Sequence, residues 1–220
     1  MPLKIIITGV TGMVGEGVLH ECLLSPEIEK ILVVTRKSSG TIHPKLSEII
    51  LADFFNPSSI INSLSGYDAC FFCAGISSVG MKEDKYRHIT YDTTLSFART
   101  LLVYNPNMVF TYVSGSHTDS SEKGKLMWAR VKGKTENDLM KLPFKKVYAF
   151  RPGFMRPTSG LKNTLKGYTF LTWLYPVLRS MFPGFVSTLK EVGDAMINTV
   201  NKGYEKSILE VRDIVKLAHA

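Results

Sequence analysis

Cysteine is scarce in this sequence, with only Cys22, Cys70 and Cys73 among 220 residues. The low, odd count argues against a disulfide framework and is typical of a reducing compartment, so we expect a cytoplasmic protein. Cys70 and Cys73 have CxxC spacing, but they lie in an apolar run that predicts a β-strand. Residues three apart on a strand point to opposite faces, so they cannot share a metal ion, and we expect no metal site.

Long apolar runs and dense basic runs are also missing. The longest apolar region, residues 168–182, contains Pro176 and Arg179 and is shorter than the ~20 apolar residues needed to span a bilayer. The apolar run near the start is too short for a secretory signal, so we expect no targeting segment. The net charge is +8, but no five basic residues are consecutive. We expect a solvated basic surface and no nucleic-acid partner, because no groove-reading motif accompanies the charge.

Short apolar runs alternate with amphipathic segments along the first two thirds of the chain. Apolar, β-branched runs predict strands at 3–8, 30–35, 46–53, 68–75, 108–115 and 145–153. Helical patterns occupy residues 12–24, 58–64, 82–103 and 123–142. Strands that alternate with helices pair in parallel through right-handed crossovers. The sequence therefore predicts an α/β fold with a Rossmann-type doubly wound parallel sheet, and ligands at the carboxyl ends of its strands.

The pattern loosens after Gly153. Residues 155–167 are loop-like, and the apolar stretch that follows predicts a helix broken near Pro176. Residues 187–200 predict an amphipathic helix that begins with a capping box, and 205–216 fit either a strand and a helix or one helix. We expect a single NAD(P)-binding domain over residues 1–220, in which residues 154–186 form a small C-terminal helical substrate lobe.

A glycine-rich loop, ITGVTGMVGEG, joins the first predicted strand to the first predicted helix. Its first glycine permits a tight turn, the second lets the backbone approach a pyrophosphate, and the third lets helix and strand pack closely. The helix N-terminus then offers free N–H groups and a partial positive charge to phosphates. The expected contacts to a dinucleotide are Gly9, Thr11, Gly12, Met13, Val14 and Gly15.

The second predicted strand ends without a carboxylate. NAD-binding proteins of this fold use an acidic residue there to bind the adenosine ribose, whereas this chain has TRKSS at 35–39. A guanidinium suits phosphate oxygens, so Arg36, with Lys37 beside it, favours NADP and its 2′-phosphate over NAD. Asp53, followed by Phe54, is placed to touch the adenine amino group or to cap the next turn. Further expected cofactor contacts end the fourth strand: Cys73, Ala74 and Gly75.

Five stretches resemble the short-chain dehydrogenase/reductase superfamily, in its atypical or extended branch with NAD-dependent epimerase/dehydratase-like proteins. They are TGVTGMVGEG, DACFFCAGISS, YVSGS, WARVKGKTEN and FRPG, and they occur in the expected order over residues 3–153. The resemblance implies catalysis by a serine after the fifth strand and a Tyr-x-x-x-Lys pair on the next helix. In that superfamily the tyrosine moves the hydroxyl proton, while the lysine lowers the tyrosine pKa and holds the nicotinamide ribose.

The resemblance is incomplete at its catalytic tyrosine. Ser114 or Ser116 matches the serine and Lys132 matches the lysine, but Trp128 occupies the tyrosine position. The i, i+4 spacing puts Trp128 and Lys132 on one helical face. An indole N–H donates a hydrogen bond but does not ionise near neutral pH, so it is no general acid or base. Trp128 could instead stack on the nicotinamide, line the substrate site or anchor the helix.

Other groups remain candidates for the missing role and for substrate binding. The stand-ins for the tyrosine are Tyr86, His88, Tyr91 and His117. The FRPG resemblance implies that Pro152 and Gly153 bring backbone close to the nicotinamide, and Arg156 is a candidate for an anionic substrate group. The aromatic residues of segment 168–186 leave four alternatives for it: a hydrophobic substrate pocket, a homodimer interface, a peripheral membrane contact or a buried core helix.

Two functional hypotheses follow from these residues. The first is an NADP-dependent oxidoreductase or epimerase-like enzyme that acts on a small or apolar carbonyl or alcohol substrate. In it, the cofactor carries out hydride transfer and the protein supplies binding and orientation. The second is a non-catalytic NADP(H)-binding protein, a sensor or interaction module, because the tyrosine is missing.

Overall fold

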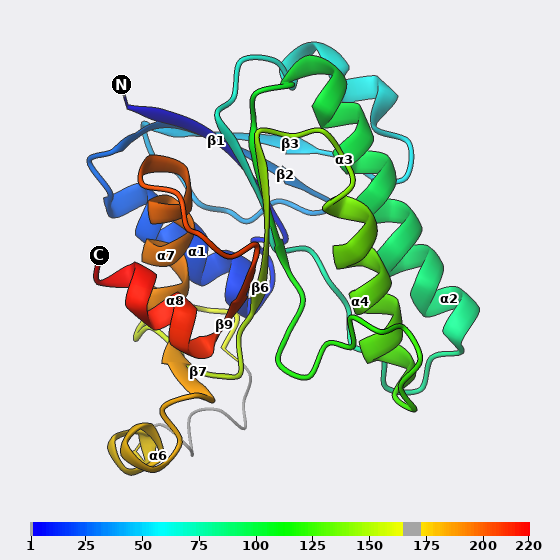
Figure 1. The fold of residues 1–220 in the computed structure, drawn as a ribbon. Helices are drawn as coiled ribbons and strands as arrows, with labels where there is room; N and C mark the ends of the chain where they lie inside the picture. The colour runs from blue at the N-terminus through cyan, green and yellow to red at the C-terminus, as the bar shows by residue number, and fades with distance from the viewer. Residues whose placement is uncertain (1, 165–172) are drawn as a thin grey trace.

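The computed structural model describes residues 2–164 and 173–220 and is built around a seven-stranded parallel sheet (Figure 1). The order of the strands is β3-β2-β1-β4-β5-β6-β9. Their bounds are β1 Leu3–Thr8, β2 Ile28–Thr35, β3 Leu46–Ile50, β4 Ala69–Phe72, β5 Val109–Val113, β6 Lys146–Arg151 and β9 Ile208–Glu210. The strand order reverses between β1 and β4, which is the place where doubly wound folds bind ligands. The predicted fold class is confirmed.

Helices cover both faces of this sheet. In Figure 1, one face carries α1 and the two C-terminal helices, and the opposite face carries α3 and α4. The first group is α1 Met13–Leu24, α7 Leu189–Asn201 and α8 Val211–Ala218. The second is the 3-10 helix η1 Pro57–Ser63, then α2 Glu83–Arg87, the π-helix η2 His88–Asp92, α3 Thr93–Tyr104 and α4 Met127–Leu139. The layers are therefore helix, sheet and helix.

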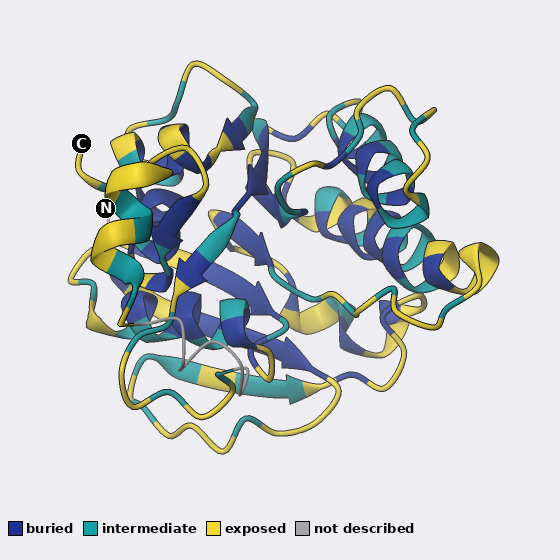
Figure 2. Cartoon of the chain, turned by 90° about the horizontal axis from the view of Figure 1, so that it is seen from below, coloured by how far each residue is buried: buried dark blue, intermediate teal, exposed yellow. Residues whose placement is uncertain are grey.

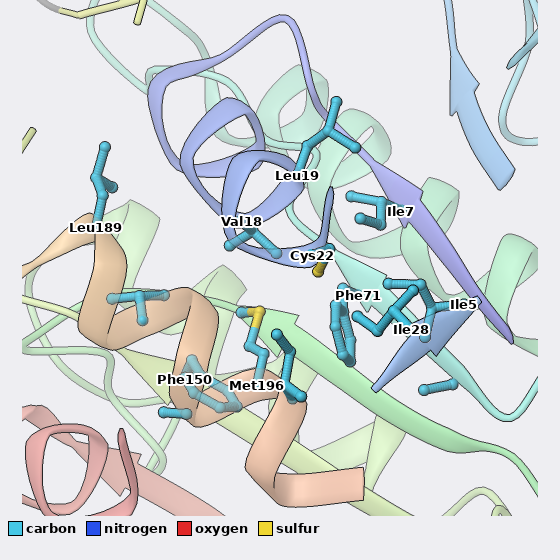
Figure 3. Packing of buried hydrophobic residues seen from close by; sticks show 14 of the residues in the cluster. Ile5, Ile7, Val18, Leu19, Cys22, Ile28, Phe71, Phe150, Leu189 and Met196 are labelled. Carbon is cyan, nitrogen blue, oxygen red and sulfur yellow. The ribbon is translucent and has the colours of Figure 1, made fainter. Parts of the chain in front are cut away.

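Each face of the sheet has its own hydrophobic core. Ile5 and Ile7 pack with α1 and α7, whereas Ile6 belongs to the cluster under α3 and α4. Figure 3 shows the first cluster, where Val18 from α1 and Met196 from α7 meet the strands. Buried residues line the sheet and the inner sides of the helices in Figure 2. The continuously apolar strands are thus explained by burial on two sides.

The C-terminal part contains a second, two-stranded sheet that the sequence did not predict. Strand β7, Phe154–Arg156, pairs in parallel with β8, Val186–Thr188. The prediction of a loop from residue 155 is therefore wrong at its start. Helix α6, Tyr175–Met181, begins with Pro176 in its first turn, where the missing N–H breaks no helical bond. The predicted break near that proline is thus a helix start, and residues 165–172 lie outside the described part.

Helix α6 projects from the body of the molecule in Figure 1. Trp173 is 68% exposed and Met181 65%, and Phe182 and Phe185 are also exposed. The interpretation of this region as a buried core helix is therefore wrong for its described residues. Within residues 2–164 and 173–220, no helix combines the length and apolar character that a bilayer crossing requires.

The remaining predicted helices are present, and the structure refines one of them. The long helix predicted at 82–103 is interrupted by the π-turn of η2, which changes the direction of the side chains that follow. The capping box of α7 is present, with Thr188 and Glu191 bonding each other's backbone N–H groups. The chain ends as a strand followed by a helix, β9 and α8, which was one of the two alternatives.

Candidate functional site

The loop between β1 and α1 has the shape of a phosphate cradle. Gly9 has a φ of +72°, and a Cβ there would lie 2.5 Å from the backbone nitrogen of Ala74. A Cβ on Gly15 would lie 2.2 Å from the Gly9 carbonyl oxygen, so this glycine lets α1 pass close to the turn. Gly12 differs, because among the described residues a Cβ there would meet only that oxygen, at 3.5 Å. The exposed start of α1 at Gly12 therefore fits a phosphate group.

Two cavities follow this loop along the carboxyl ends of β1, β2 and β4. The first, of about 280 Å³, is lined by Gly9, Thr11, Gly12, Thr35, Arg36, Phe54, Cys73, Ala74 and Gly75. The second, of about 210 Å³, is lined by Arg36, Ala52, Asp53, Phe54, Phe72, Ala74, Gly75, Ile76, His88, Ile89 and Thr93. Because several residues line both cavities, the two form one groove. We call them the phosphate cavity and the adenosine cavity, after the parts of a dinucleotide that the sequence predicts at their lining residues.

Arg36 lines both cavities and is exposed at the point where β2 ends. Asp53 lines the adenosine cavity, and its Oδ1 also accepts a hydrogen bond from the Phe55 N–H over 2.9 Å. One carboxylate oxygen thus caps the turn, which was one of the two roles predicted for it. The Lys37 carbonyl accepts a hydrogen bond from the Thr35 hydroxyl over 2.9 Å. Among the described residues, the predicted cofactor contacts that line neither cavity are Met13, Val14, Gly15, Lys37, Lys132, Pro152 and Gly153.

The predicted catalytic serines lie where β5 and β6 end. Ser114 is buried, and its hydroxyl donates to the Phe150 carbonyl over 3.1 Å. Ser116 is half-buried, and its hydroxyl donates to the Arg151 carbonyl over 3.3 Å. Lys132 donates from Nζ to the carbonyl oxygen of Ser114. The structure therefore brings Lys132 and Ser114 together, with Ser116 two residues further along the chain.

Lys132 lies in an environment that weakens its positive charge. Burial lowers the pKa of its amino group to about 8, although the nearby Glu136 acts in the opposite direction. The fully buried Glu136 carboxylate accepts two hydrogen bonds from Arg151, at 3.0 and 2.5 Å. Arg151 also donates to Glu210 over 3.1 Å and to Ser120 over 2.5 Å. This network joins α4 to β6, β9 and the loop before α4.

The tyrosine position itself holds a half-buried Trp128. The nearby tyrosines are engaged elsewhere. Tyr112 and Tyr86 are each 1% exposed, and burial raises the pKa of both phenols. Tyr91 donates its hydroxyl to Asp138 over 2.7 Å, and burial together with that carboxylate raises the Tyr91 pKa. Each of these phenols is therefore a weaker acid than an ordinary tyrosine.

The other candidates are distributed over separate parts of the molecule. His88 lines the adenosine cavity. His117 is exposed, with a φ of +66°, and its ring centroid lies 6.3 Å from that of Phe185. The guanidinium of Arg156 lies over the ring of Tyr175, 5.1 Å from its centroid. Within the described part of the chain, no group of His, Cys, Asp and Glu side chains is arranged to hold a metal ion.

Packing against the lobe explains why residue 153 is glycine. A Cβ there would lie 2.2 Å from the Phe185 carbonyl oxygen, which also accepts a hydrogen bond from the Phe154 N–H over 2.9 Å. The glycine thus permits β7 to approach the segment before β8. The approach of Pro152 and Gly153 to a nicotinamide remains a prediction.

A carboxylate joins the lobe to the phosphate cradle. Glu16, in the first turn of α1, accepts hydrogen bonds from the backbone N–H groups of Lys162 and Asn163, over 2.8 and 2.7 Å. The start of α1 and the described end of the loop after β7 are therefore held side by side. No local pattern indicates this contact, because it joins residues 146 and 147 positions apart.

This geometry agrees with a comparison to protein families. The family model described as the NAD dependent epimerase/dehydratase family matches residues 5–124, more than half of the chain. The chain belongs to this family. The matched region contains the glycine loop, both cavities and the end of β5, and it confirms the predicted resemblance. An NAD-type nucleotide is accordingly the cofactor class of the family.

Individual relatives and solved structures extend the comparison to almost the whole chain. The mitochondrial protein FMP52 of Candida albicans is 25% identical, covering 97% of both chains. A short-chain dehydrogenase/reductase of Saccharomyces cerevisiae has a TM-score of 0.68 at 14% identity, covering 99% of this chain and 98% of its own. The enzyme WbmF of Bordetella bronchiseptica, solved with NAD⁺, has a TM-score of 0.65 at 15% identity, covering 97% and 76%. At these identities the structural likeness shows the fold.

The relatives contradict the expected cytoplasmic location. The similar proteins of Candida albicans, Emericella nidulans and Scheffersomyces stipitis are all named mitochondrial. The prediction rested on the low cysteine count, which indicates a reducing environment without distinguishing one compartment from another.

Six residues that line the groove were not predicted as cofactor contacts or as stand-ins for the tyrosine. They are Thr35, Ala52, Phe72, Ile76, Ile89 and Thr93. The first three lie at or near the carboxyl ends of predicted strands. Because ligands bind at these ends in doubly wound folds, the predicted strands could have indicated these residues. Ile89 and Thr93 reach the groove from the helical segment around the π-turn. The sequence pattern predicted this helix but did not indicate the π-turn.

Proposed function

We propose that this chain is an NADP-dependent oxidoreductase or epimerase-like enzyme that acts on a small or apolar carbonyl or alcohol. The observation that carries the cofactor preference is the position of Arg36, which lines both the phosphate and the adenosine cavity. A 2′-phosphate extends from the ribose that joins those two parts of the cofactor. The exposed guanidinium at the end of β2 offers paired donors for it, and residues 35–39 include no carboxylate of their own. The neighbouring Glu48 carboxylate of β3 is engaged by hydrogen bonds from Ser38 and Ser39.

The cofactor preference is tested by calorimetric titration of NADPH and NADH. Arg36→Gln should weaken NADPH binding by about 10- to 150-fold, the equivalent of one charged hydrogen-bonding contact of 1.5–3 kcal/mol. The same variant should change NADH binding less than about threefold, because NADH lacks the phosphate that the guanidinium contacts. Lys37→Gln is the matched control, since Lys37 is equally exposed but lines neither cavity. An equal loss for both nucleotides in Arg36→Gln would refute the proposed preference.

A second candidate function is a non-catalytic NADP(H)-binding protein. It is favoured by Trp128 in the tyrosine position and by the engaged hydroxyl of Tyr91. The two functions are separated by following NADPH oxidation with a broad panel of carbonyl compounds. The enzyme hypothesis expects turnover above the blank, raised further in Trp128→Tyr. Tight NADPH binding without turnover in either protein would favour the binding function.

For the exposed apolar region 173–185 we propose contact with a membrane surface. Helix α6 projects from the body of the molecule (Figure 1), and exposed apolar side chains lie on it and on both sides of it: Trp173, Val177, Met181, Phe182 and Phe185. The net charge of +8 suits anionic lipid. We also propose a mitochondrial location, which the names of the relatives support; cell fractionation tests it.

The membrane proposal is tested by co-sedimentation with vesicles that contain anionic lipid. Trp173→Ser with Phe182→Ser should abolish sedimentation, whereas Leu24→Ser, which alters a side chain equally exposed on α1, should not. Equal sedimentation of all three proteins would contradict the proposal. A concentration-dependent dimer lost only in the double variant would instead identify a homodimer interface.

A further inference from the structure

The proposed reaction requires a proton that the tyrosine position cannot supply. Reduction of a carbonyl places an electron pair on its oxygen, and an acid must protonate that oxygen. Trp128 has no ionisable group, and the Tyr91 hydroxyl is turned toward Asp138. Tyr86 and Tyr112 are buried in the layer between the helices and the sheet. The two histidine candidates lie elsewhere, because His88 lines the adenosine cavity and His117 is exposed beside the Phe185 ring. Among the described residues named as candidates, Lys132 remains as the ionisable side chain anchored at the end of β5.

From the arrangement of these residues, we propose that Lys132 is itself the proton donor of the reaction, acting directly on the substrate oxygen. This inference rests on the proposed enzymatic function. Lys132 is on the same helical face as Trp128, one turn further along α4, so its side chain lies beside the position that the tyrosine would occupy. Its Nζ is anchored on the Ser114 carbonyl at the carboxyl end of β5. An ammonium group has three N–H donors, so one such bond leaves others for a ligand.

The electrostatic surroundings fit this role. Lysines that act as acids or bases at neutral pH have a pKa near 7–8, reached by burial. Burial lowers the Lys132 pKa to about 8, with Glu136 on the same helix opposing the shift. The Glu136 charge is itself neutralised by Arg151 from β6, and Tyr112 on β5 adds an uncharged phenol to the same region. The ammonium form therefore predominates at pH 7 and releases its proton without a large energy cost.

The step balances without any further reactant. The reduced nicotinamide supplies hydride to the carbonyl carbon, and the carbonyl π electrons move to oxygen. One N–H bond of the Lys132 ammonium breaks as the O–H bond of the alcohol forms, which leaves a neutral amine. Water returns a proton to that amine before the next turnover. In the oxidative direction, the neutral amine accepts the hydroxyl proton.

The first test measures the proton on Lys132 independently of turnover. The full-length protein, with and without NADP⁺, is pulse-labelled with acetic anhydride between pH 6 and 11, and the labelling of each lysine is quantified by peptide mass spectrometry. Lys132 should show a labelling midpoint near pH 8. Lys134, two residues away and paired with Asp138, is the internal control and should titrate well above that value. A Lys132 midpoint at the ordinary lysine value near 10.4 would overturn the proposal.

The second test measures turnover with NADPH and a carbonyl substrate. The rate of reduction should fall as the pH rises above about 8, because the amine loses the proton that it donates. Lys132→Arg retains the positive charge but does not release its proton, so it should lower kcat by about 10²- to 10⁴-fold. Its affinity for NADPH, measured by calorimetry, should stay within about threefold of the wild type. Lys134→Arg should leave both quantities unchanged.

The outcomes distinguish the two proposals. Full activity in Lys132→Arg, or a pH profile without the alkaline limb, would overturn the role of Lys132 and leave the oxidoreductase function standing. A kcat that falls together with NADPH affinity would show a binding role and also overturn the proton-donor role. Tight NADPH binding by the wild type without turnover would overturn the enzymatic function and, with it, the proton transfer.

Discussion

Replacing Arg151 with methionine should destabilise the protein by about 3–5 kcal/mol, the usual cost of removing one partner of a buried ion pair. Arg151 is 8% exposed and Glu136 is fully buried, so the variant leaves a carboxylate in the core without its two charged hydrogen bonds. The lost contact to Glu210 adds little, because that carboxylate is half exposed and such pairs contribute about 0–1 kcal/mol. The free energy of unfolding is measured by urea denaturation at pH 7.

The double variant Arg151→Met with Glu136→Met separates the charge from the packing. Buried ion pairs replaced by apolar residues of similar volume are often neutral or stabilised, so the double variant should recover most of the loss. Lys134→Met, which breaks a half-buried pair on the same helix, should cost only about 1 kcal/mol, because Asp138 keeps its hydrogen bonds from Tyr91 and Lys141. A single variant as stable as the wild type, or a double variant less stable than the single, would refute this reasoning.

Three further predictions concern the cradle, Lys132 and α7. Gly15→Ala should fail to fold or lose several kcal/mol of stability, because its Cβ would lie 2.2 Å from a backbone oxygen. Gly12→Ala should keep its thermal stability but lose NADPH binding. Two variants with the same stability and the same NADPH affinity would contradict the assigned roles. Between pH 8 and 10.5 the stability of the wild type relative to Lys132→Met should rise by up to about 3 kcal/mol in urea titrations, because the unfolded chain binds the Lys132 proton more tightly than the folded protein does. The comparison cancels the opposite effect of the three cysteines, whose thiol pKa values are raised by burial. Thr188→Ala should cost about 1 kcal/mol through the lost cap, and Thr188→Ser should cost less; both are measured by thermal denaturation.

Local sequence patterns were sufficient to predict the strands of the larger sheet and the helices that cover it. Buried residues recur there with the spacing of a strand or a helix, so the apolar pattern reveals the element. Their ends were harder to predict. Strand β4 ends at Phe72, before the predicted boundary, since its pairing with β1 ends at Thr8 and Phe72 and the Ala74 N–H then donates to the Thr8 side-chain hydroxyl. Helix α4 begins four residues after its predicted start, because Asp119 accepts hydrogen bonds from the backbone at 121 and 124 and holds that segment in a turn.

The candidate site also has features that the sequence could predict and features that it could not. The glycine loop, Arg36 and Asp53 were predictable, because each follows a strand whose position the sequence reveals. The engagement of Tyr91 with Asp138 was not, because the two residues are 47 positions apart and meet only when the second helical layer packs. The lowered pKa of Lys132 likewise depends on burial by the folded chain, which a spacing pattern does not contain.

The two hydrogen bonds at Glu16 have a mechanical consequence. One carboxylate accepts hydrogen bonds from two backbone N–H groups of the loop after β7. Residues 162–163 therefore cannot move away from α1 unless both bonds break or the helix moves with them. The first turn of α1, which follows Gly12, therefore cannot move independently of residues 162–163 while both bonds to Glu16 are intact.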